Sequence, residues 1–206
     1  MNILWIQAFV LMLCLLSAGI AFASGGKKLY KSPGNERMNN ADYDGSGNFL
    51  SERLNQVFPS LGYLRTIDNC VYDFDQTGRC RVIDFGFSAN ASSRVQLPHF
   101  ISLSNDSRYA DVDFIYISFD DVATIRKDIH SLTDCKYDKL IIFSVDKAYF
   151  MQSEKPLLAC GCPTIYFVDR NGIVKAIANG GNSTADEHTE SQLKATWRAC
   201  IESLLT

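Results

Sequence analysis

Hydrophobic and polar residues follow two different periods along the second half of the chain. Runs rich in β-branched and aromatic residues predict strands, whereas apolar residues three and four positions apart predict helices. A hairpin or two successive strands are expected within residues 70–87, and further strands over 111–118, 139–145, 164–168 and 173–178. Helices are expected over 92–104, 120–132 and 186–205, and Pro98 should kink the first of them.

This order of elements predicts the fold class. Alternating strands and helices favour parallel strands joined by right-handed crossovers. The turn that contains Asn171-Gly172 has hairpin chemistry and adds antiparallel strands to the same sheet. We therefore expect an α/β protein with a central mixed β-sheet flanked by helices.

The N-terminus carries an uncharged apolar run. Residues 3–23 contain no charged side chain and end in Ala21-Phe22-Ala23, which predicts a secretory signal peptide over 1–23. The alternative is an uncleaved membrane anchor, because about 20 apolar residues can span a bilayer. Both interpretations place the folded part outside the cytoplasm, secreted or periplasmic. Contact with a membrane is expected only if the segment stays uncleaved.

The rest of the chain divides into an extension and one domain. Residues 24–62 are rich in Gly, Asn and Ser and predict an irregular polar N-terminal extension with a short helix near 50–58. A folded domain is expected over 63–206. The 206 residues are 47% hydrophobic and carry a net charge of −3, so nothing indicates disorder or nucleic-acid binding.

The cysteine content predicts disulfides. Loss of the leader removes Cys14 and leaves an even number, which in an exported protein argues for structural disulfides rather than zinc. No Cys-x-x-Cys pair is present, so neither a metal nor a cofactor is expected. Six cysteines allow fifteen pairings, and the sequence does not choose among them. The disulfide candidates are Cys70, Cys80, Cys135, Cys160, Cys162 and Cys200.

Three of these cysteines have a local interpretation. Cys70 and Cys80 flank the turn at 75–78 and would bridge a hairpin there. Cys200 lies on the apolar stripe of the last helix, where a lone thiol often serves as a small apolar filler. A partial calcium-loop pattern begins at Asp42, but Arg53 stands where the chelating Glu belongs, which favours a flexible Gly-rich turn.

Three stretches carry a resemblance to a known family. They are Val82 to His99, the strand Phe114 to Ser118 with the helix after it, and Pro163 to Val174. They resemble exported thioredoxin-like thiol-disulfide proteins of the TlpA and ResA kind. The resemblance covers roughly residues 80–205 and implies a thioredoxin-like fold with a cis-proline loop at Pro163.

The resemblance breaks at the active site. When the sequences are aligned on Leu97-Pro98-His99, Asn90 takes the place of the first active cysteine and Ser93 that of the second. The family's reaction needs a thiolate at the helix N-terminus, and neither Asn nor Ser forms a mixed disulfide. We therefore predict a degenerate active site, and the standard thioredoxin reaction is excluded at this position.

Two functions remain open. The first is a non-catalytic binding or structural module, which would hold an extracytoplasmic polypeptide by main-chain pairing along the cis-proline edge at Pro163 and Thr164. The second is an atypical thiol-disulfide oxidoreductase that uses Cys160 and Cys162, which the loop Cys160-Gly-Cys162-Pro163 places near the old active site. The sequence leaves open whether the protein is an enzyme.

Overall fold

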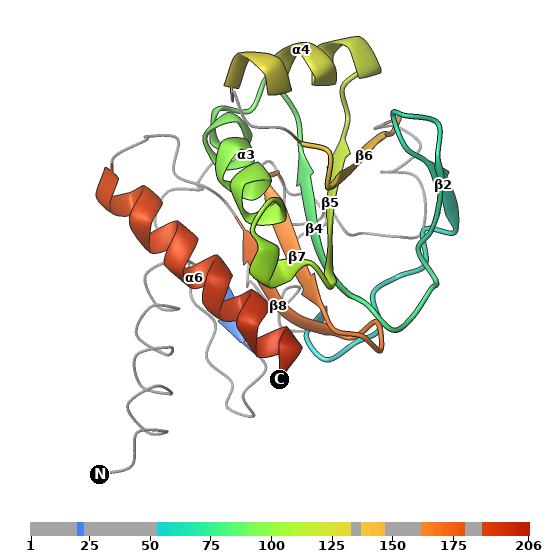
Figure 1. Cartoon of the computed structure of the whole chain (residues 1–206), viewed down its shortest axis with the longest axis vertical. Coiled ribbons are helices and arrows are strands. Elements are labelled where there is room, and N and C mark those ends of the chain that lie inside the picture. The colour runs from blue at the N-terminus through green and yellow to red at the C-terminus, as the bar shows by residue number, and fades with distance from the viewer. Residues whose placement is uncertain (1–19, 23–52, 133–136, 147–161, 180–186) are drawn as a thin grey trace, which may run out of the picture.

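A mixed β-sheet forms the centre of the protein (Figure 1). The computed structural model describes residues 20–22, 53–132, 137–146, 162–179 and 187–206. Within these ranges the main sheet has six strands in the order β1-β8-β7-β4-β5-β6. The strands are β1 (Ile20–Phe22), β4 (Cys80–Gly86), β5 (Val112–Ser118), β6 (Leu140–Ser144), β7 (Thr164–Val168) and β8 (Val174–Asn179).

The pairing directions follow from the connections. Strands β4, β5 and β6 are parallel, because α3 (Ala91–Ser104) and α4 (Val122–Leu132) cross over between them. Strand β7 is antiparallel to β4 and to β8, and β8 is antiparallel to β1. The last helix, α6 (Glu187–Leu205), packs with α3 against one face of the sheet (Figure 1). The predicted mixed sheet flanked by helices is therefore confirmed.

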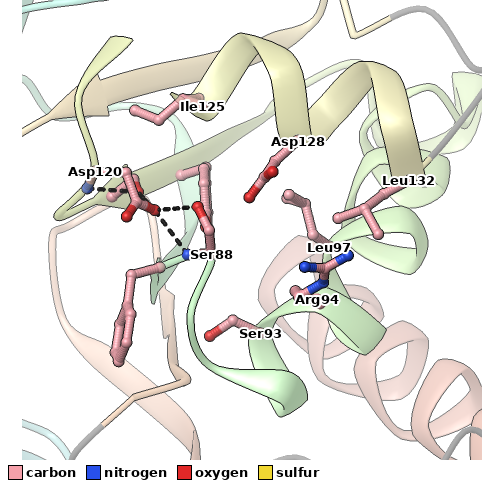
Figure 2. Close-up of a pocket in the computed structure, with 11 residues that line it drawn as sticks. Ser88, Ser93, Arg94, Leu97, Asp120, Ile125, Asp128 and Leu132 are labelled. Atoms are coloured by element: carbon pink, nitrogen blue, oxygen red, sulfur yellow. Dashed lines mark hydrogen bonds between the residues drawn. The ribbon is translucent and has the colours of Figure 1, made fainter. Parts of the chain in front are cut away.

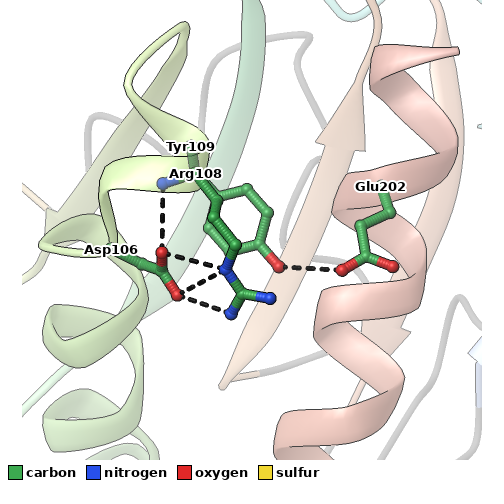
Figure 3. A network of polar contacts seen from close by, with 4 residues as sticks. All are labelled: Asp106, Arg108, Tyr109 and Glu202. Atoms are coloured by element: carbon green, nitrogen blue, oxygen red, sulfur yellow. Dashed lines mark hydrogen bonds and ion pairs between the residues drawn. The ribbon is translucent and has the colours of Figure 1, made fainter.

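The connection from α3 to β5 is fixed against α6 (Figure 3). It contains a short 3-10 helix, η1 (Ser107–Tyr109), whose Asp106 cap is paired with the Arg108 guanidinium at 2.6 Å. The Tyr109 hydroxyl donates a hydrogen bond of 3.3 Å to Glu202 of α6. This network joins the α3 end of the domain to the C-terminal helix.

The hairpin predicted within 70–87 forms elsewhere. Strand β3 (Val71–Asp73) pairs with β2 (Tyr63–Arg65) in a separate two-stranded sheet, and not with β4. The turn between β2 and β3 is closed by a hydrogen bond of 2.9 Å from Asn69 N to Thr66 O. Asn69 has a positive φ of 66°, a conformation that asparagine tolerates.

Three of the predicted disulfide cysteines carry free thiols. Because β3 does not pair with β4, Cys70 stays exposed while Cys80 is buried, and the predicted bridge between them is wrong. The Cys80 thiol instead donates to the Leu204 carbonyl of α6 at 3.3 Å. Cys200 is also free and fully buried, and burial raises the pKa of its thiol to about 12. Cys135 and Cys160 lie outside the described residues.

The packed core begins before residue 63. Leu54, Phe58 and Leu61 are buried on the sheet face opposite α3 and α6. Asn55 N and Phe58 N donate to carbonyls of the β7–β8 hairpin, each at 2.8 Å. The helix predicted near 50–58 is wrong over 54–58, where the chain forms a turn and an isolated bridge.

The remaining N-terminal predictions fall largely outside the described residues. That holds for the loop that begins at Asp42 and for residues 1–19 of the predicted signal peptide. Strand β1 lies within the signal-peptide range and pairs Ala21 with Ile177 of β8. The described residues do not test whether this segment is cleaved, so the signal peptide stays a prediction. Among the described helices, none has the length and apolar character needed to cross a bilayer.

The hairpin of β2 and β3 lies beside the outer strand β6 (Figure 1). Ile67 N donates a hydrogen bond of 2.9 Å to the Ile142 carbonyl of β6. Arg126 of α4 forms an ion pair of 2.7 Å with Asp68 in the same turn. These contacts fix the hairpin turn between β6 and α4.

Candidate functional site at the start of α3

The N-terminus of α3 joins the loop before β7 through one side chain. Asn90 caps α3: its Oδ1 accepts a hydrogen bond of 3.0 Å from Ser93 N. Its Nδ2 donates a hydrogen bond of 2.9 Å to the Cys162 carbonyl. The two predicted degenerate positions and the predicted cis-proline loop therefore meet at one place. Asn90 satisfies one of the helix N–H groups that lack a partner within the helix.

The loop before β7 is arranged as the resemblance implies. The peptide bond between Cys162 and Pro163 is cis. Cys162 is half-buried, whereas Pro163 and Thr164 are buried. Thr164 begins β7, and it pairs with Phe85 on one side and Asn179 on the other. The two residues predicted to bind polypeptide, Pro163 and Thr164, are therefore both buried, and Thr164 is paired within the sheet; Cys162, which precedes them, lies nearer the surface.

Ser93 is a buried polar group without a partner. Its side chain is 4% exposed, and its hydroxyl makes no hydrogen bond. A Cβ on Gly86 would lie 3.1 Å from Ser93 Oγ and 3.0 Å from the Tyr116 ring. The absence of a side chain at Gly86 therefore lets β4, β5 and α3 approach closely here.

Hydrogen bonds to Asp120 connect the ends of the parallel strands β4, β5 and β6; those from Ser88 and Ser118 are drawn in Figure 2. Its Oδ2 accepts hydrogen bonds of 2.7 Å from both Ser88 N and Ser88 Oγ. The same oxygen accepts from Ser118 Oγ at 3.0 Å, and Ser144 Oγ donates to the Asp120 main-chain carbonyl at 2.6 Å. One residue thus holds the segment that leads from β4 to the Asn90 cap.

Replacing Asp120 by alanine is expected to destabilise the fold by about 3 kcal/mol, because several hydrogen-bond donors lose their acceptor. Urea unfolding followed by tryptophan fluorescence measures the change. The matched control is Asp138→Ala, since Asp138 is exposed and should change stability by less than about 0.5 kcal/mol. Equal stability of the two variants would contradict the role given to Asp120.

A buried carboxyl group lies in β4 beneath the site. Asp84 is 1% exposed and its Oδ1 makes no hydrogen bond. Burial raises its pKa from 3.8 to about 8, so the group is largely protonated at neutral pH. Asp113 of the neighbouring strand β5 is paired differently, because it accepts hydrogen bonds from Arg79 Nε at 2.6 Å and from Tyr72 OH at 2.9 Å.

A narrow pocket opens between α3, α4 and the ends of β4 and β5 (Figure 2). It has room for about one water molecule. The polar residues that line it include Ser93, Ser118 and Asp120, and the apolar ones include Leu97 and Ile125. Among the described residues, no group of three or more His, Cys, Asp or Glu side chains is placed to hold a metal ion.

The sequence predicted one part of this site and missed another. The convergence of Asn90 with the Cys162 loop followed from the resemblance. The hydrogen bonds from Ser88 and Ser118 to Asp120 were not predicted. The available signal was the position of these residues, since Ser88 follows β4 and Ser118 ends β5. Ends of adjacent parallel strands meet at one edge of a sheet, which brings their polar residues together.

Solved structures of other proteins show the same fold. No family model and no curated protein matches the chain. A thiol:disulfide interchange protein of the thioredoxin family from Chlorobium tepidum TLS is 13% identical, with a TM-score of 0.54 over 73% of this chain and 97% of that one. A thiol:disulfide interchange protein from Bacteroides sp. is 16% identical, with a TM-score of 0.53 over 72% and 90%.

A third structure agrees with these two. The thioredoxin domain of a thiol-disulfide oxidoreductase from Bacteroides vulgatus is 17% identical, with a TM-score of 0.52 over 72% of this chain and 97% of that one. Identities this low establish the fold and not the activity. The chain therefore has a thioredoxin-like fold, as predicted; Asn90 caps its α3, and Ser93 lies in the first turn of that helix.

Proposed function

We propose that the protein is an exported, non-catalytic thioredoxin-like module that binds an extended polypeptide beside the start of α3. The observation that carries this proposal is the pair of hydrogen bonds made by Asn90, to Ser93 N and to the Cys162 carbonyl. Because Asn90 caps α3 and also holds the loop before β7, it fixes the surface that these two segments form together. It has no thiol for exchange.

The loop before β7 supports binding of a polypeptide. From Thr164 onward, β7 is paired on both sides, so its main chain is used by the sheet. Cys162 precedes this ladder and is half-buried, and its main-chain carbonyl accepts a hydrogen bond from Asn90 Nδ2 beside the start of α3. An extended segment can pair with main-chain groups at this position.

The predicted signal peptide supports export. It directs the module to a compartment outside the cytoplasm, where its partner would be an extracytoplasmic polypeptide.

A second candidate is thiol-disulfide exchange by Cys160 and Cys162. One observation favours it: the main-chain carbonyl of Cys162 accepts a hydrogen bond from Asn90, the cap of α3, so this residue lies beside a helix N-terminus, and a helix N-terminus favours a thiolate. Insulin reduction by dithiothreitol separates the candidates. Under our proposal, neither the wild-type protein nor Cys162→Ser accelerates the reaction. Acceleration by the wild type that Cys162→Ser abolishes would establish the second candidate instead.

Polypeptide binding is tested directly with carboxymethylated α-lactalbumin, an unfolded chain without free thiols. We expect fluorescence anisotropy to show saturable binding that Ala91→Trp weakens at least about tenfold, because Ala91 is exposed in the first turn of α3. The control is Ser102→Trp, since Ser102 is exposed near the other end of the same helix. Absence of binding, or an equal effect of both variants, would overturn the proposal.

A further inference from the structure

The pocket beside α3 combines unused hydrogen-bond acceptors with an apolar wall. Ser93 is 96% buried, lines the pocket and has a hydroxyl without a partner. Asp120 uses Oδ2 for its hydrogen bonds to Ser88 and Ser118, and Oδ1 accepts none of them. The apolar residues that line the same pocket, here called its apolar wall, include Leu97, Ile125 and Leu132 (Figure 2).

The charges around the pocket favour a cation. Asp120 and Asp128 line it together with the single cation Arg94, which leaves one excess negative charge among these residues. Tyr116 also lines the pocket, and its pKa is raised by burial, by Asp84 and by Asp120, so the phenol stays neutral. No other titratable residue of the described chain lines this pocket.

The size of the pocket narrows the choice of cation. Room for about one water molecule suits an ammonium group, whereas a planar guanidinium is too large. An ammonium donates three hydrogen bonds, and both Ser93 Oγ and Asp120 Oδ1 are available to accept them. The apolar wall suits the methylene stem of a lysine, which packs along apolar surface while its charged end reaches polar groups.

We propose that this pocket receives a primary ammonium group, supplied by a lysine side chain of the bound polypeptide. The source of the lysine rests on the proposed function, whereas the affinity of the pocket for an alkylammonium ion does not. The pocket would then select polypeptide segments that place a lysine beside the N-terminus of α3.

The first test uses n-butylammonium chloride with the full chain. Amide chemical shifts of pocket residues are followed by NMR at constant ionic strength, with n-butanol and guanidinium chloride as comparison ligands. We expect saturable shifts with n-butylammonium alone. Ser93→Ala should weaken this binding about fivefold, the loss of one hydrogen bond to a charged group. Because the Ser93 hydroxyl has no partner, this variant should keep the stability of the wild type.

The control variant is Ser102→Ala, which removes an exposed hydroxyl from the same helix and should leave n-butylammonium binding unchanged. Binding of n-butanol as strong as that of n-butylammonium, or no effect of Ser93→Ala, would overturn the inference.

The second test compares carboxymethylated α-lactalbumin before and after acetylation of its lysines. We expect acetylation to weaken binding at least about fivefold, because it removes the charge and two of the donors. Equal binding of both forms would overturn the inference and leave the proposed function standing. Binding of n-butylammonium that depends on Ser93, with no binding of either polypeptide, would support the pocket and overturn the proposed function.

Discussion

Replacing Asn90 and Ser93 together by cysteine is expected to give the protein disulfide reductase activity. The two positions lie in the first turn of α3 with the spacing of Cys-x-x-Cys, and the helix N-terminus stabilises a thiolate there. The cis peptide bond before Pro163 is already present beside them. We expect insulin reduction by dithiothreitol to accelerate about tenfold over the uncatalysed reaction.

The single variants Asn90→Cys and Ser93→Cys are the controls. Because Cys162 lies beside Asn90, each is made in a Cys162→Ser background, where it provides one thiol without a neighbour to resolve the mixed disulfide, so neither should turn over. If the double variant folds, forms its new disulfide and still fails to reduce insulin, the prediction is wrong, and reductase activity at this position requires more than the two cysteines.

The second large effect is expected at Asp84. The pKa of this carboxyl is raised from 3.8 to about 8 in the folded protein, because burial disfavours the charged form. The contribution of a neutral Asp84 to stability is therefore fully present below pH 4. It is lost progressively as pH rises toward 8, because the unfolded chain then gives up a proton that the folded chain keeps. The loss amounts to about 4 kcal/mol between pH 4 and pH 7.

The variant Asp84→Asn keeps the shape of the side chain and cannot ionise. We expect its free energy of unfolding to match that of the wild type near pH 4 and to exceed it increasingly up to pH 8. Urea unfolding at several pH values measures both slopes, and all other titrating groups are common to the two proteins. Parallel slopes would show that Asp84 is ionised in the folded state.

The sequence predicted the elements whose period is long and regular. The strand expected over 164–168 coincides with β7, and the helices expected over 92–104 and 120–132 agree with α3 and α4 to within two residues. The pairing of β3 was not predictable in the same way. Strand β2 has only three residues, too few to show a period, and the choice between β2 and β4 as a partner depends on distant packing.

The candidate site was likewise predicted only in part from the sequence. Asn90 and Ser93 were found because they occupy aligned positions in a known arrangement. Asp120 was not found, because its role depends on three strand ends that are far apart in sequence and meet only in the folded sheet. The unpartnered state of Ser93 also depends on the fold, since any serine can form hydrogen bonds until its surroundings are known.

The hairpin of β2 and β3 also bears on the solubility of the protein. An outer strand with unpaired main-chain groups invites another chain to extend the sheet, which leads to aggregation. The hydrogen bond from Ile67 N to the Ile142 carbonyl occupies one such group of β6, and the ion pair between Arg126 and Asp68 fastens the turn that supplies it. The hairpin therefore makes it harder for a strand of another molecule to pair with β6 and extend the sheet.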